Sequence, residues 1–83
     1  MENEILFVIS MFSLDQTICL VNADGNIVRK ECHRNNDIPK AIYEMMKTGH
    51  TKKLKIHGNK IYAQRFTKEL MKNYTHNVEI KFI

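Results

Sequence analysis

The chain has 83 residues, a mass of 9.8 kDa and a formal net charge of +4. A chain this short forms one modest core, so we expect a single compact domain over residues 1–83. Hydrophobic residues make up 43% and charged residues 27%, which excludes a disordered chain. No apolar run approaches the roughly 18 residues of a membrane span. The acidic N-terminal residues also differ from a secretory signal, so we expect a cytoplasmic protein without membrane contact.

The charge is unevenly distributed along the chain. Residues 1–46 carry four basic and seven acidic side chains, a net charge of −3. Residues 47–83 carry nine basic and two acidic side chains, a net charge of +7. Such halves can attract each other within one fold, or they can leave a dipolar surface that steers association.

Three strands are expected first. Residues 4–12 are rich in β-branched and aromatic types without polar alternation, which predicts a strand covered on both faces. Residues 16–22 and 26–32 flank Asp24-Gly25, a hairpin signal because both turn positions favour positive φ. A two-residue loop there would pair Val21 with Val28 and Cys19 with Lys30.

Helical spacing begins after the polar segment 33–37. Asp37 is the expected N-cap of a helix with Pro39 in its first turn, which ends at Gly49. Residues 52–57 alternate as a short strand with one lysine-rich face. Asn59 can cap a second helix over residues 60–74, and residues 78–83 alternate as a final strand.

The expected order is therefore strand, strand, strand, helix, strand, helix, strand. We predict an α/β fold, with α+β as the alternative, built on a mixed sheet of about five strands and two helices.

This order resembles the ribonuclease H-like core, which is shared with the actin-like ATPases. In sequence, residues 17–28 resemble the second and third strands of that superfamily, and residues 54–58, with a helix after them, resemble its fourth strand. The nucleases of the family hold metal ions with a carboxylate in the first strand and another near the end of the fourth. Here those positions fall at Ser10 and His57, and Glu4 lies too early in the strand. Residues 10–15 also lack the glycine of the actin-like phosphate loop, so the resemblance implies a catalytically empty member.

Other chemical motifs are weak. Cys19, Cys32, His33 and His57 could ligate a metal ion, but structural zinc sites usually show close cysteine pairs, and this chain has none. Neither Ser10 nor Ser13 lies in a Gly-x-Ser-x-Gly elbow. We therefore expect no catalytic residue, no metal site, no cofactor and no enzyme activity.

The second half of the chain carries a candidate nucleic-acid surface. A solvated helix face is the simpler explanation of its basic stripe, but the same side chains could contact phosphates in a salt-dependent and largely sequence-blind way. The candidate residues are Lys52, Lys53, Lys55, Lys60, Arg65, Lys68 and Lys72.

Two apolar features are candidate protein interfaces. Met45 and Met46 are adjacent on a helix, so we expect that both cannot face one core and that one lies at a boundary or partner surface. Val78, Ile80 and Phe82 lie on a strand that could pair, at the edge of a small sheet, with a partner or a second copy.

The leading functional hypothesis is a small non-enzymatic accessory or assembly protein that acts through protein–protein contact and forms a homo-oligomer. Its Lys/Asn/Ile-rich composition suggests a viral or mobile-element origin, which would place it in the host cytoplasm. One alternative is a non-specific nucleic-acid-binding protein that uses the basic second half. The other is a degenerate ribonuclease H-like nuclease.

Overall fold

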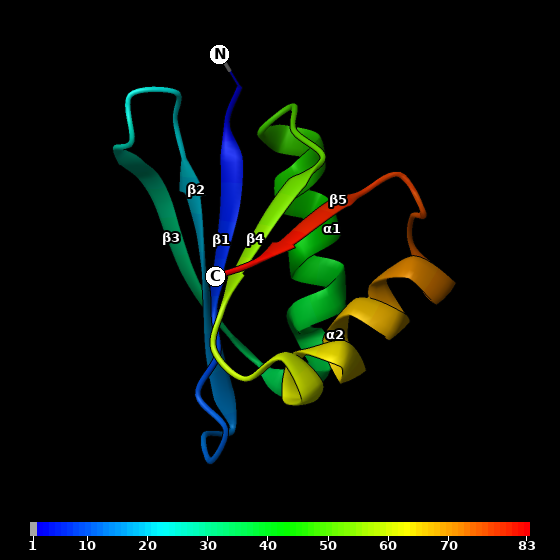
Figure 1. The fold of residues 1–83 in the computed structure, drawn as a ribbon. Coiled ribbons are helices and arrows are strands. Elements are labelled where there is room, and N and C mark those ends of the chain that lie inside the picture. Colours follow the sequence, from blue (N-terminus) through cyan, green and yellow to red (C-terminus); the bar gives the residue numbers. More distant parts are fainter. Residues whose placement is uncertain (1) are drawn as a thin grey trace.

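The structure is a computed structural model that describes residues 2–83 as one mixed five-stranded sheet with two helices (Figure 1). This confirms the predicted fold class and the predicted order of elements. In chain order the elements are β1 (Glu4–Val8), β2 (Asp15–Val21), β3 (Ile27–Arg34), the 3-10 turn η1 (Asn35–Asp37), α1 (Ile38–Thr48), β4 (Lys53–His57), α2 (Lys60–Asn73) and β5 (Glu79–Phe82).

The strands lie in the order β3-β2-β1-β4-β5. The first three form an antiparallel meander, and β4 and β5 continue the sheet parallel to β1. Both helical crossovers, β3-α1-β4 and β4-α2-β5, advance across the sheet in the same direction. Because such crossovers are right-handed, both helices lie on the same face, and the other face of the sheet is left open (Figure 1).

The core lies between this sheet and the helices. Alternate residues of β1, β2 and β4 point towards the helices, as the pleat requires. Phe7 of β1 meets Phe66 of α2 edge-to-face, with ring centroids 5.3 Å apart. The other large buried side chains are Ile5, Ile18, Leu20, Ile38, Ile42, Met45, Met46, Leu54, Ile56 and Leu70.

The expectation for the two adjacent methionines is wrong. Met45 is 2% and Met46 6% exposed, and both belong to the core. Helix α1 packs against both α2 and the sheet. Together these two neighbours cover enough of the helix surface to bury two adjacent residues. Neither methionine therefore offers a side chain to a partner.

The first strand is shorter than predicted. β1 ends at Val8, and residues 9–14 form a loop before β2. The side chain of Gln16 bonds both backbone groups of Ser10, so the chain turns there instead of continuing the ladder.

The hairpin between β2 and β3 differs from the predicted two-residue loop. Asn22 N–H donates to the carbonyl of Asn26, and the Asn22 side-chain oxygen accepts from the amides of Asp24 and Asn26. In this turn only Gly25 has positive φ, at 86°. Cys19 pairs with Lys30 as predicted, whereas a register shift pairs Val21 with Ile27 instead of Val28.

The two helix starts are at the predicted residues. Asn59 caps α2 by accepting a 2.8 Å hydrogen bond from the amide of Tyr62. Asp37 occupies the N-cap position of α1, but its side chain makes no capping hydrogen bond. The two helices therefore start with different stabilisation.

Candidate interaction surfaces

One end of the molecule carries exposed apolar side chains on the β1–β2 loop. Phe12 is 98%, Leu14 71% and Met11 44% exposed, and we call these three residues the apolar tip. Ile61, which is 80% exposed, lies at the start of α2, and both this helix start and the loop are at the lower end of the molecule (Figure 1).

The loop that carries the apolar tip is fixed by a buried glutamine. Gln16 is 2% exposed. Its Oε1 accepts from the amide of Ser10 at 2.7 Å, and its Nε2 donates to the carbonyl of Ser10 at 2.8 Å. The same Nε2 also donates to Oδ1 of Asn35 at 3.0 Å. The glutamine therefore ties the start of the loop to η1.

Asn35 fixes the other end of the loop. Its Nδ2 donates to the carbonyl of Ser13 at 3.1 Å, and its backbone amide donates to the carbonyl of Leu14 at 3.0 Å. The Ser13 hydroxyl in turn accepts from the amide of Asp15 at 3.1 Å. With both ends bonded, the apolar tip projects from an ordered backbone.

A hollow separates the apolar tip from α2. It is lined by Leu14, Arg34, Asn35, Asn36 and Arg65. The Arg65 guanidinium donates to the hydroxyl of Tyr62 at 3.3 Å and lies 5.0 Å from the centroid of the Phe66 ring. Arg34 approaches Asp15 at 3.6 Å, and both side chains are largely exposed. We call this cleft the two-arginine hollow.

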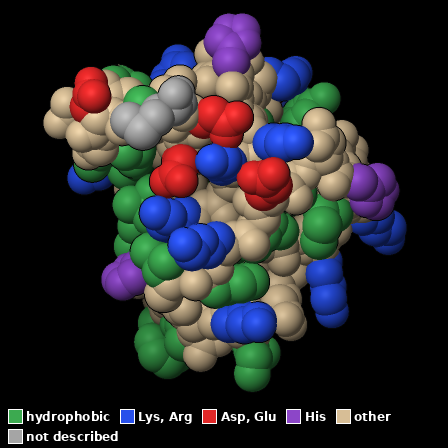
Figure 2. Space-filling view, turned by 45° about the horizontal axis from the view of Figure 1, so that its top comes forward, with side chains coloured by type: hydrophobic (Ala, Val, Ile, Leu, Met, Phe, Trp, Pro, Cys, Tyr) green, Lys and Arg blue, Asp and Glu red, His purple; other side chains and the backbone are tan. Residues whose placement is uncertain are grey.

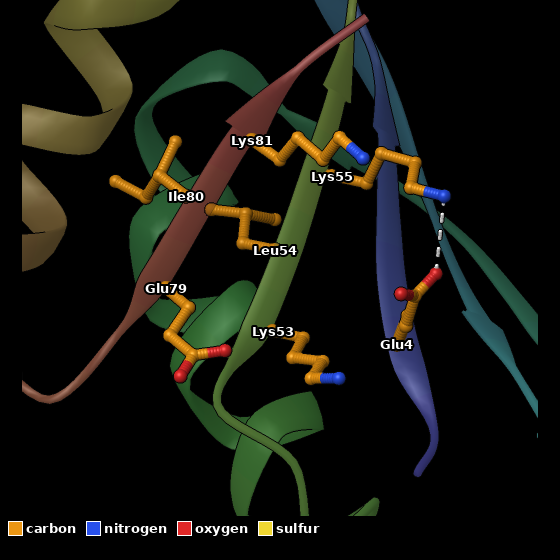
Figure 3. Close-up of a pocket in the computed structure, with 7 residues that line it drawn as sticks. All are labelled: Glu4, Lys53, Leu54, Lys55, Glu79, Ile80 and Lys81. Carbon is orange, nitrogen blue, oxygen red and sulfur yellow. Dashed lines mark ion pairs between the residues drawn. The ribbon is translucent and has the colours of Figure 1, made fainter. Parts of the chain in front are cut away.

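The open face of the sheet carries paired charges. Lys53 lies 3.1 Å from Glu2. Lys55 lies 3.3 Å from Glu4, the ion pair drawn in Figure 3. Glu79, which lies 3.9 Å from Lys52, lines a shallow pocket here with Glu4, Lys53, Lys55 and Lys81 (Figure 3). Acidic and basic side chains intermingle at the upper part of the molecule in Figure 2.

The ion pair with Glu2 changes the acidity of Lys53. Its hydrogen bond to Glu2 and the negative charge of that carboxylate raise the pKa of Lys53 above its usual value. The ammonium is therefore charged throughout the physiological range and is already engaged by an acid.

The structure divides the predicted basic surface in two. Lys53 and Lys55 point from β4 to the open face, because Leu54 and Ile56 between them point into the core. The α2 residues lie on the opposite side of the sheet and are exposed; they are Lys60, Arg65, Lys68 and Lys72. The expectation that all these residues form one nucleic-acid surface is therefore wrong.

The apolar residues of the last strand are turned inward. Val78, Ile80 and Phe82 are partly buried and pack against the core. They offer little side-chain surface to a partner. What β5 does offer is its outer backbone edge, since it is the last strand of the sheet.

The titratable side chains are scattered. Cys19 is buried, Cys32 is exposed, and both thiols are free. His33 lies 2.7 Å from Glu31, whereas His57 is exposed at the end of β4. Within residues 2–83, no three acidic, histidine or cysteine side chains are grouped as metal ligands.

Within the same residues, no helix has the length and apolarity needed to cross a membrane.

No family model and no curated protein matches the chain.

Sequence reasoning missed the main surface feature, because it placed Met11 and Phe12 inside a buried strand and assigned no role to Gln16. The polar residues Ser10 and Ser13, which interrupt the apolar run, were the available signal of a loop.

Proposed function

We propose that the protein is a small non-enzymatic assembly or accessory protein that acts through protein–protein contact at the apolar tip. The observation that carries this proposal is the near-complete exposure of Phe12 beside the exposed Leu14. Single exposed apolar residues are ordinary, but a cluster of large ones is typical of an interaction site. Aromatic residues, including phenylalanine, are also enriched at the core of protein interfaces.

The rigidity of the loop supports the same proposal. Ordering a loop on binding costs free energy, which reduces affinity. Here the hydrogen bonds of Gln16 and Asn35 order the backbone before any partner arrives. A preorganised anchor suits binding, whereas nothing in the fold itself needs Phe12.

The resemblance to the ribonuclease H-like core remains part of this proposal. The observed order of elements is the one on which the resemblance rests. The ends of β1 and β4 are adjacent, with Val8 paired to His57. Ser10, the residue expected at one of the family's carboxylate positions, lies in the loop after β1, and His57 ends β4. Neither side chain is a carboxylate, which supports a binding role over nuclease activity.

Site-specific photocrosslinking tests the proposal. A benzophenone amino acid at position 12, in cells that produce the protein, should yield a discrete crosslinked protein. A product of twice the monomer mass would identify a second copy as the partner. The matched control carries the benzophenone amino acid in place of Lys30, an exposed residue of β3. Equal or absent crosslinking at both positions would refute a contact at the apolar tip.

A second candidate function is non-specific nucleic-acid binding by α2. Lys60, Lys68 and Lys72 are exposed, and none has an acidic partner within 4.0 Å among the described residues. A single acid, Glu69, lies on this helix. The helix is therefore the more available of the two basic surfaces.

Fluorescence anisotropy with a 30-nucleotide single strand tests this candidate. At about 50 mM salt, K68E/K72E should bind the strand more weakly than the wild-type protein. If both lysines contact phosphates, the plot of log association constant against log salt concentration should also become less steep, by about 1.4. The control variant K53E/K55E reverses two lysines of the open face and should bind better than K68E/K72E. No binding by the wild-type protein would eliminate this candidate.

A further inference from the structure

We infer that the partner segment is acidic as well as apolar: its apolar side chains cover Phe12 and Leu14 while one of its carboxylates enters the two-arginine hollow. This inference rests on the proposed function and specifies the chemistry of the partner. It follows from the position of the hollow, which shares Leu14 with the apolar tip.

The lining of the hollow is suited to an anion. Arg34 comes from the end of β3 and Arg65 from α2, and no acidic side chain is among the lining residues. Asn36 adds an exposed amide. Guanidinium groups present paired N–H donors that match the two oxygens of a carboxylate.

Arg65 is held in position before any ligand binds. Its guanidinium lies over the rings of Tyr62 and Phe66, at 5.5 and 5.0 Å from their centroids. The hydroxyl of Tyr62 occupies one of its donors at 3.3 Å. Because a guanidinium has five N–H donors, most of them stay available to a ligand.

Arg34 can exchange its present partner for a ligand. Its distance of 3.6 Å to Asp15 is longer than a hydrogen bond, and the two side chains are 72% and 55% exposed. Such exposed pairs contribute little free energy. A partner's carboxylate that desolvates both arginines would compete well with Asp15.

The neighbourhood favours a protein over a nucleic acid as the source of the anion. Leu14 lines the hollow itself, and Ile61 lies one helical turn from Arg65 on α2. Aliphatic side chains of this size match the apolar centre of a protein interface, whereas interfaces with nucleic acid are more polar and more basic.

Selection from a random 12-residue peptide library displayed on phage tests the inference. Peptides enriched on the wild-type protein should combine Asp or Glu with large apolar residues. R65E should weaken their binding about 10- to 100-fold, the range expected for loss of a charge-assisted contact. The matched control K72E makes the same kind of charge reversal on α2 and should change binding less than threefold. R65K keeps the charge without the planar fork and should give an intermediate loss.

The outcomes separate the inference from the proposed function. If the selected peptides lose binding on F12A/L14A but not on R65E or R34Q, the acidic partner is wrong and contact at the apolar tip stands. Peptides that are indifferent to F12A/L14A would refute both. If no acidic peptide is enriched and a 30-nucleotide strand binds in an R65E-sensitive way, the hollow binds phosphate and the inference fails. A peptide in which Lys replaces the acidic residue should regain binding to the R65E variant, because the two charges are then exchanged.

Discussion

Gln16 is buried, yet it is polar, and its amide satisfies three partners on two segments of the chain. It behaves as a structural substitute for the strand hydrogen bonds that β1 loses after Val8. Sequence patterning did not indicate this role, because a glutamine at the start of a strand ordinarily points to solvent.

Replacing Gln16 by alanine should destabilise the domain by about 2 kcal/mol, because it removes three hydrogen bonds made by a buried side chain. Urea unfolding followed by circular dichroism measures this free energy. The same substitution at Gln64, a partly exposed residue of α2, should change it by less than about 0.5 kcal/mol. Equal effects would mean that Gln16 does not hold the loop.

Gly58 and Gly25 both have positive φ, but their surroundings differ. Gly58 has φ of 138°, and an added Cβ would lie 2.9 Å from the Cβ of Ile9. G58A should therefore cost about 3 kcal/mol through backbone strain and a steric clash. Gly25 has φ of 86° but an open environment, so G25A should cost only about 1 kcal/mol. Thermal or urea unfolding of both variants measures the difference, and the reverse order would contradict this account.

The elements were the most predictable part of the molecule. The helical spacing after residues 33–37 and the alternation over residues 52–57 correctly located α1 and β4. The β1 boundary and the hairpin register were wrong, because long-range hydrogen bonds and a register shift decide them. Such contacts leave no periodic signal in one sequence.

The two helix starts allow a test at the scale of elements. N59A should destabilise the protein by about 1 kcal/mol, because it removes the bond from the Asn59 side chain to the amide of Tyr62. D37A should cost less, since the Asp37 side chain makes no such bond. Urea unfolding of both variants provides the comparison. A larger loss for D37A would show that charge near the start of α1 outweighs capping.

At the scale of the molecule, the two phenylalanines Phe7 and Phe12 have opposite surroundings. Phe7 is fully buried beneath α2, and Phe12 is almost fully exposed. Both belong to one apolar run of the sequence, so hydropathy alone could not separate core from surface. The candidate site was less predictable than the core for this reason.

F7A should cost about 3–5 kcal/mol, a large share of the roughly 4–12 kcal/mol expected for a domain of this size. F12A should leave the unfolding free energy within about 0.5 kcal/mol of wild type while it abolishes peptide binding. Calorimetric melting distinguishes the two variants. A large destabilisation by F12A would mean that Phe12 contributes to the fold and is not a free anchor.

The central position of β1 also affects how the chain folds during its synthesis. One partner of β1 is β2, which is close by in sequence. The other partner is β4, and a long stretch of chain separates the end of β1 at Val8 from the start of β4 at Lys53. As the chain leaves the ribosome, the β1–β2–β3 meander can form from local contacts first. One edge of β1 then stays unpaired until residues 53–57 emerge, because a parallel strand needs its crossover helix. For that interval the nascent chain exposes the edge of what becomes the central strand of its sheet, and a chaperone that recognises unpaired strand edges in nascent chains could bind there.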